Sequence, residues 1–198
     1  MRTIYKFAIL TFVSSTLLVV ACKKEQSSNS VPTPVNIFTT QVPPDRTLND
    51  SIWTDSTGIQ IGLKFQSSVP ILISGIKYFK TAANIGQHVG QIYSSTGDLL
   101  ASQEFSSESD SGWQSATFAT PVKMAANTTF IASCFSSLGY YNSSDWTLYA
   151  NITNGTLTIL ADGKDGPNGV FKYTNSPAFP DSSFRKTNYW IDIIEQKQ

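Results

Sequence analysis

His88 is the only histidine in the chain of 198 residues, so any reaction that needs an imidazole depends on it. A Ser-His-Asp arrangement would use this ring as its general base. The histidine stands in NIGQHVGQIY, between turn-forming residues and an apparent strand, and no serine occupies a Gly-x-Ser-x-Gly elbow. We therefore interpret His88 as a structural or exposed residue. A zinc site is not expected, because zinc usually takes three or four nitrogen, sulfur or carboxylate ligands.

Paired carboxylates are the other groups in this sequence that could cleave a sugar polymer. Most of the acids stand in polar, turn-rich segments, where they are usually solvated. Asp192 differs because it interrupts the apolar run YWIDII. Strand alternation leaves it either on the solvent face or buried with a hydrogen-bond partner or a metal. The acids considered are Glu104, Glu108, Asp110, Asp145, Asp162, Asp165, Asp181 and Asp192.

Calcium is the one cofactor for which the sequence offers ligands, in the segment ADGKDGPNG. Asp162, Asp165 and Asn168 carry hard oxygen atoms of the kind that calcium prefers. The spacing differs from an EF-hand loop, because Lys164 and Gly166 occupy the third and fifth positions. Asp-Gly and Asn-Gly are also favoured turn formers, so the segment is either a plain turn or a calcium loop.

Aromatic side chains gather in two polar segments near the C-terminus, LGYYNSSDWTLYAN and NSPAFPDSSFRKTNYW. Sugars stack on aromatic faces, and aromatics among turn residues are harder to explain as core than those on alternating strands. Trp113 and Trp190 stand on apparent strands and are expected in the core. The residues that we select as candidate ligand-binding residues are Tyr140, Tyr141, Trp146 and Arg185.

The N-terminus has the form of a bacterial export signal. Arg2 and Lys6 precede an apolar stretch that is shorter than the ~20 residues of a membrane-spanning helix. The stretch ends in Val-Val-Ala-Cys, which resembles a lipoprotein lipobox. That resemblance implies cleavage after residue 21, a diacylglycerol on the Cys22 thiol and acylation of the new amino group. Several acyl chains on one residue form a stable membrane anchor.

The expected organisation is a lipoprotein signal peptide (1–21), a polar and proline-rich tether (22–35) and one β-sandwich domain (36–195). No aspartate follows Cys22, which favours the outer membrane of a bacterial envelope. A lipidated Cys22 leaves Cys134 without a disulfide partner, and we expect Cys134 to be buried and inert. Charged residues make up only 14% of the chain and balance to zero, so no nucleic acid partner is expected.

Strand patterns dominate the chain from Ile59 onward. Alternating apolar residues predict a strand in IQIGLKFQ, a bulge at Gly75 in ILISGIKYFK and a hairpin in VGQIYSSTGDLLASQEF. Two further strands are expected around a turn at 126–127, and a closing strand covers 188–196. Strands every 8–12 residues without helical stripes indicate an all-β sandwich or barrel.

Several blocks occur in an order that resembles the domain of unknown function 4082 family. They are IGLKFQSSVPILISGIKYFK, NIGQHVGQIYSSTGDLLASQEF, SGWQSATFATPVKMAANTTFIAS, ADGKDGPNGVFKY and TNYWIDI. The likeness spans roughly residues 37–194 and departs from the family pattern at 132–141. It implies a single β-sandwich of jelly-roll type, found in exported proteins beside polysaccharide-degrading enzymes. It implies no catalytic residues.

Three functions are consistent with this sequence. The first is a non-catalytic envelope module that binds carbohydrate, which predicts an exposed aromatic patch. The second is a structural or adhesion accessory that binds a protein partner, which predicts a flat apolar patch or an open sheet edge. The third is a glycoside-type hydrolase, which predicts two carboxylates facing each other in a groove. The first is favoured.

Overall fold

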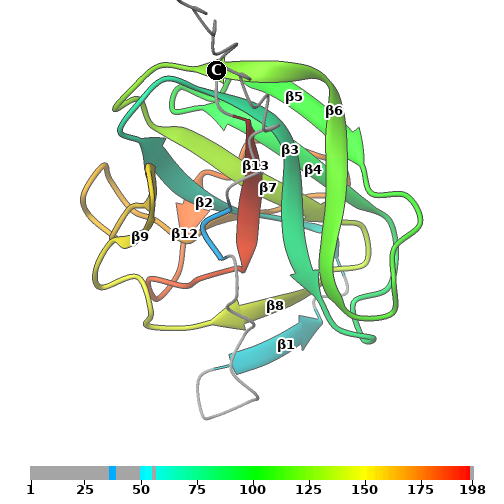
Figure 1. Ribbon diagram of the computed structural model, residues 1–198. Helices are drawn as coiled ribbons and strands as arrows, with labels where there is room; N and C mark the ends of the chain where they lie inside the picture. The colour runs from blue at the N-terminus through cyan, green and yellow to red at the C-terminus, as the bar shows by residue number, and fades with distance from the viewer. Residues whose placement is uncertain (1–35, 39–49, 55–56, 197–198) are drawn as a thin grey trace, which may run out of the picture. The chain divides into compact units, whose positions relative to one another are not determined.

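The computed structural model describes residues 36–38, 50–54 and 57–196, with only the backbone of residues 50–54. The expected leader (1–21), Cys22 and the tether (22–35) lie outside these residues. Every regular element in the described part of the chain is a β-strand (Figure 1). Among the described residues no helix could cross a membrane. The expectation of an all-β fold is confirmed.

The strands follow one another as β1 (Asp50–Thr54), β2 (Ile59–Ser67), β3 (Ile71–Lys80), β4 (His88–Ser94), β5 (Leu99–Glu104), β6 (Gly112–Met124), β7 (Phe130–Ser136), β8 (Tyr140–Ser144), β9 (Ile152–Asn154), β10 (Leu157–Ile159), β11 (Val170–Tyr173), β12 (Ser182–Ser183) and β13 (Ile191–Gln196).

Two antiparallel sheets pack together as a sandwich (Figure 1). The larger has eight strands in the order β12-β11-β2-β7-β4-β5, and β10 joins it by pairing with β2 and β9. The smaller has the order β13-β3-β6. A separate ladder pairs β1 with β8. The candidate site is built from β8, β11 and the segment that leads into β13.

The alternation of apolar and other residues along the strands places the apolar side chains in the core. Ile59, Ile61, Leu63 and Phe65 on β2 are at most 3% exposed and face the same interior. The smaller sheet contributes residues such as Ile73 to the same cluster. At ~25 cal/mol per Å² of apolar surface, this burial is the main stabilising contribution to the fold. The two sheets therefore form a firm support for the loops at their ends.

Three details of the strand prediction can be compared with the structure. The ladder between β3 and β6 shifts register between Ile73 and Gly75, so the predicted bulge is confirmed. The hairpin is also confirmed, as β4 and β5. The closing strand was expected from residue 188, but β13 begins only at Ile191. The backbone of Trp190 is left-handed, with φ of +53°, and this prevents an earlier start.

Asp192 holds the first described segment of the chain against β13. Its carboxylate accepts hydrogen bonds from the backbone N–H groups of Ile37 at 2.9 Å and Phe38 at 2.7 Å. The Ile193 N–H donates a third bond. Asp192 does lie opposite the core residues of β13, as alternation predicts, but only 1% of it is exposed. The solvent-face interpretation is therefore wrong, and the buried interpretation with hydrogen-bond partners is right.

The expected core positions of three other residues are confirmed. Trp190 is buried, and Trp113 is half-buried against the core. Phe38 packs against both rings, with centroid separations of 5.8 Å to Trp113 and 5.1 Å to Trp190. Cys134 is a buried free thiol, and burial raises its pKa well above the usual value. Such a thiol is unreactive, because the thiolate is the nucleophilic form.

Candidate functional site

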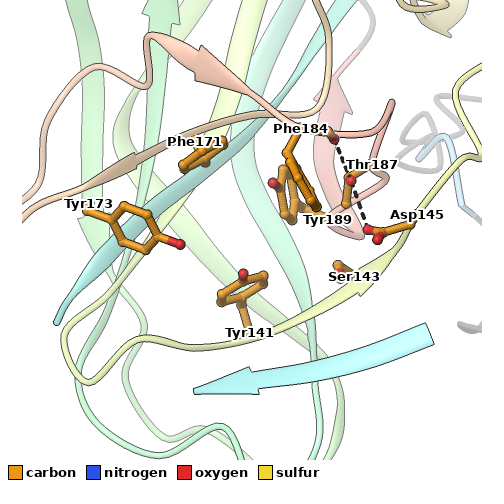
Figure 2. A pocket seen from close by; sticks show the side chains of 8 residues that line it. All are labelled: Tyr141, Ser143, Asp145, Phe171, Tyr173, Phe184, Thr187 and Tyr189. Atoms are coloured by element: carbon orange, nitrogen blue, oxygen red, sulfur yellow. Dashed lines mark hydrogen bonds between the residues drawn. The ribbon is translucent and has the colours of Figure 1, made fainter. Parts of the chain in front are cut away.

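A pocket of about 190 Å³ lies between β8, β11 and the segment before β13 (Figure 2). Figure 2 shows five aromatic rings arranged around one space, with smaller polar side chains on one side. The lining residues are Tyr141, Ser143, Asp145, Phe171, Tyr173, Phe184, Thr187 and Tyr189. The volume is below the ~300–1,000 Å³ of pockets for drug-sized ligands, so the pocket suits a single small ring.

The lining residues come from three short segments, and each segment contains lining residues that are two positions apart. Tyr141 and Ser143 are two residues apart on β8, so they share one face of the strand, and Asp145 follows in the turn directly after it. Phe171 and Tyr173 alternate in the same way on β11, and Thr187 and Tyr189 do so before β13. The pocket therefore combines strand residues of β8 and β11 with turn and loop residues that are distant from them in the sequence.

Backbone hydrogen bonds join the loop after β8 to the segment before β13. Ser144 and Asn188 exchange a pair of bonds at 2.9 and 3.0 Å. The N–H of Trp146 donates to the carbonyl of Arg185 at 2.8 Å, and the Leu148 N–H donates to Lys186 at 3.0 Å. These bonds fix two walls of the pocket relative to each other. A ligand would meet a preformed site, which lowers the entropic cost of binding.

Asp145 is the only formally charged residue among those that line the pocket. Its Oδ1 accepts a hydrogen bond from the Thr187 hydroxyl at 3.0 Å, and its Oδ2 lies 3.4 Å from a guanidinium nitrogen of Arg185. Asp145 is 7% exposed, so it acts in a partly desolvated setting. Burial raises the pKa of the neighbouring Tyr189 far above its usual value, helped by the charge of Asp145. Tyr189 therefore stays a neutral hydroxyl at all ordinary pH values.

Ser143 adds a hydroxyl group that has no hydrogen-bond partner among the described residues. The residue is 2% exposed and lines the pocket. A buried hydroxyl without a partner costs free energy, on the order of 1–3 kcal/mol. A polar ligand in the pocket would satisfy this group once the Ser143 side chain rotates toward it.

An exposed aromatic platform adjoins the pocket and consists of Trp146 and Tyr149. These side chains are 47% and 63% exposed, and their ring planes are inclined by only 16°. The guanidinium carbon of Arg185 lies 6.0 Å from the Trp146 ring and 4.6 Å from the ring of Phe184 at the pocket. Arg185 thus links the platform to the pocket through cation–π contacts.

The exposed aromatic residues of the described chain all belong to this region. They are Trp146, Tyr149, Tyr173 and Phe184, and the other large exposed apolar residues are aliphatic. A soluble surface usually exposes large rings singly, and a group of them marks a binding surface. The pocket and the platform therefore form one continuous candidate site.

Backbone strain is concentrated at the same place. Trp146, Arg185 and Lys186 have φ values of +59°, +47° and +52°, in the left-handed region that bulky residues rarely occupy. Each such residue costs of order 1–3 kcal/mol unless its surroundings hold it there. Here the backbone hydrogen bonds between the loop after β8 and the segment before β13 hold these residues in place. Strain of this kind is typical of ligand sites.

The proposed calcium ligands have other partners in this structure. Asn168 is buried, and its Oδ1 accepts backbone N–H bonds from Lys64 at 2.8 Å and Gly169 at 2.7 Å. Its amide nitrogen donates to the carbonyls of Lys64 and Leu160. Asp162 accepts the Asn168 N–H at 3.0 Å, and Asp165 is exposed. Among the described residues, no group of three His, Cys, Asp or Glu side chains could hold a metal ion.

His88 is a buried structural residue away from the pocket lining. It is 1% exposed, and its Nδ1 lies 3.0 Å from Glu108 Oε1. Lys80 contributes an ammonium 2.6 Å from the other oxygen of Glu108. Burial lowers the pKa of His88, and this effect exceeds the opposing influence of Glu108. The histidine is therefore held in its neutral form, beside an ion pair that is already complete.

The structure brings three of the four candidate binding residues together. Tyr141 lines the pocket, Trp146 belongs to the platform, and Arg185 lies between them. Tyr140 is half-buried and does not line the pocket. Sequence reasoning did not select Ser143, Asp145, Phe171, Tyr173, Phe184, Thr187 or Tyr189 as ligand-binding residues. Their alternating spacing was a usable signal, but nothing in the sequence showed that the three segments meet.

The model of the family described as "Domain of unknown function (DUF4082)" matches residues 45–191. The match extends from the residues before β1 to the first residue of β13, and it includes the whole lining of the pocket. No curated protein matches the chain.

Proposed function

We propose that this chain, which belongs to the DUF4082 family, is a non-catalytic carbohydrate-binding module of the bacterial envelope, held there by lipid on Cys22. The observation that carries the proposal is the clustering of every exposed aromatic residue of the described chain around one pocket that also contains polar side chains. Sugars present apolar C–H faces and polar hydroxyl edges, and this surface offers partners for both.

The polar groups of the lining support the proposal, because they could pair with sugar hydroxyls. Asp145 accepts hydrogen bonds, and Ser143 can donate and accept them at the same wall. The platform of Trp146 and Tyr149 would support a second ring outside the pocket. A carbohydrate longer than one unit would therefore use both parts of the site.

A hydrolase of the two-carboxylate type receives less support. Such enzymes place two acids about 5–10 Å apart across the scissile bond. Among the residues that line this pocket, Asp145 is the only acid. Glu108 and Asp192 are committed elsewhere, to His88 and to the backbone of Ile37 and Phe38. These contacts favour binding over cleavage.

A protein partner is the second candidate, and β5 is the observation that favours it. Among the described strands, this one is the last in its sheet and pairs only with β4. Leu99 and Leu100 on it are 54% and 41% exposed. An open edge with exposed leucines can accept a strand from another protein. It lacks the aromatic and polar groups of the pocket, so we rank it second.

A glycan-binding screen with residues 32–198 tests the first candidate. We expect retention on at least one polysaccharide and a loss of about tenfold or more in affinity for Trp146→Ala, since stacked aromatics contribute about 1–3 kcal/mol. Leu138→Ala is the matched control, because Leu138 is similarly exposed at 49% but does not line the pocket. Binding that both variants retain equally, or no retention on any glycan, would refute the proposal.

A further inference from the structure

The charges that line the pocket limit the class of ligand that it can bind. Its lining carries one formal charge, the carboxylate of Asp145, and no basic residue. Five aromatic rings also line the pocket, and an aromatic ring can bind a cation through its negative face. Aromatic walls with one acid form the surroundings that attract an ammonium group. An anionic ligand would be repelled at the same place.

Arg185 offsets part of this negative charge, through a long hydrogen bond to Asp145. Its nitrogen lies 3.4 Å from Asp145 Oδ2, beyond the ~2.7–2.9 Å of a strong charge-assisted hydrogen bond. Its side chain is 48% exposed and rests on the outer rings of Phe184 and Trp146. The guanidinium is therefore a loosely held surface cation. A ligand ammonium could take its place beside Oδ2 while Arg185 remains on the aromatic rim.

The unpartnered hydroxyl of Ser143 sets a second requirement for the ligand, which is a hydrogen-bonding group beside the ammonium. It is buried at the wall that carries Asp145, two residues away on the same face. A bare ammonium ion of tetraalkyl type would leave this hydroxyl without a partner. A ring that carries both an ammonium and hydroxyl groups would satisfy Ser143 and Asp145 together.

We propose that the pocket binds the ring of an amino sugar with a free ammonium group, with the ammonium directed to Asp145. This inference rests on the proposed carbohydrate-binding function and adds the class of sugar. The next unit of the chain would lie on Trp146 and Tyr149. Acetylation of the amine removes the charge and enlarges the group, so N-acetylated chains bind more weakly.

Calorimetric titration with three oligosaccharides of equal length tests the proposal: β-1,4-linked glucosamine, N-acetylglucosamine and glucose. We expect glucosamine chains to bind about tenfold tighter than the other two. Asp145→Asn removes this preference but retains an oxygen that accepts the Thr187 bond. Arg185→Gln strengthens glucosamine binding more than glucose binding, because a competing cation is lost. Asp110→Asn is the control, since Asp110 is exposed and lies outside the lining.

The outcomes separate the two proposals. Equal or tighter binding of the N-acetylated or glucose chains would overturn the amino-sugar inference and leave carbohydrate binding in place. A preference for glucosamine that survives in Asp145→Asn would overturn it as well. Binding of choline without binding of any oligosaccharide would overturn both. Thermal unfolding of each variant confirms that the fold is retained.

Discussion

Gly169 lies directly against the backbone of Thr187. A Cβ atom on Gly169 would stand 2.3 Å from the Thr187 carbonyl oxygen and 2.7 Å from its nitrogen. Gly169 precedes β11, which carries Phe171 and Tyr173, and Thr187 lines the opposite part of the pocket. The glycine also has a φ of +72°. Its missing side chain therefore sets the distance between two walls of the site.

Gly169→Ala should open the pocket and destabilise the fold. We expect a loss of about 2–4 kcal/mol in the free energy of unfolding, from overpacking and from the left-handed backbone together. Gly155→Ala is the matched control, with φ of +59° and open space around the new Cβ. Denaturant unfolding measures both. Equal losses for the two variants would show that the contact with Thr187 does not matter.

Asp192→Asn should release the segment that the carboxylate holds. Asparagine keeps one acceptor oxygen but brings an N–H₂ group toward backbone donors. We expect a loss of about 2 kcal/mol, typical of hydrogen bonds to a charged acceptor. Hydrogen exchange should become faster at the amides of Ile37 and Phe38. Unchanged exchange at these two amides would show that the Asp192 carboxylate does not hold this segment. Asp110→Asn serves as the control.

The stability of the fold should decrease as the pH falls below about 6.5, because of His88. Burial lowers the pKa of His88 below its usual 6.5, so the unfolded chain takes up the proton first as the pH falls. Stability from this group is present above about pH 6.5 and is lost as the pH falls below it, with a ceiling of about 1.4 kcal/mol at pH 5.5 that is set by the pKa of the unfolded chain.

Comparison with His88→Gln isolates this effect, because the chain has no other histidine. Burial raises the pKa of Asp192, which acts in the opposite sense at acidic pH, and the comparison cancels its contribution. Denaturant unfolding at each pH gives the two stability profiles. Parallel profiles for the two proteins would rule out His88 as the titrating group.

Calcium should leave the melting temperature unchanged, although the sequence suggested a calcium loop as one alternative. Asn168 Oδ1 already accepts two backbone hydrogen bonds and has no further lone pair for a cation. Thermal unfolding with calcium and with a chelator measures this. A clear rise in melting temperature with calcium would restore the metal interpretation. Asn168→Ala should lower the melting temperature in both conditions, because the loop loses its attachment to β2.

Cys22→Ser should release the protein from the membrane. Without the thiol no diacylglycerol can be attached, and the chain would fractionate with soluble envelope contents. Labelling with a palmitate analogue, followed by separation of membrane and soluble fractions, gives the result. Cys134→Ser is the control for a general effect of losing a cysteine. Membrane association of Cys22→Ser at the level of the unaltered protein would exclude the lipid anchor.

Local sequence patterns predicted most of the fold. The alternation of Ile59 and Ile61 and the phase break at Gly75 were visible because they depend only on neighbours in the chain. The position of Asp192 was only half predictable. Alternation placed it correctly on the face away from the core, but the segment that covers it comes from residues 36–38. When residues distant in the sequence cover a side chain, the sequence around that side chain does not indicate its burial.

The candidate site was less predictable for the same reason. Trp146 and Arg185 stood out because large or charged residues in polar loops are unusual. Tyr173 and Thr187 looked like ordinary strand and loop residues. Only the antiparallel pairing of β11 with β2, and the bridge between Ser144 and Asn188, bring them to one pocket. A single sequence contains these pairings only implicitly.

The hydrogen bonds between Asp192 and the residues Ile37 and Phe38 have a mechanical consequence. A lipid on Cys22 would make the tether carry tension whenever a bound polymer is pulled away from the membrane. Along the chain, that load reaches Ile37 and Phe38 before it reaches β1, the partner of β8. The load is therefore transferred to β13 and its ladder with β3. The tether therefore does not pull directly on the ladder between β1 and β8.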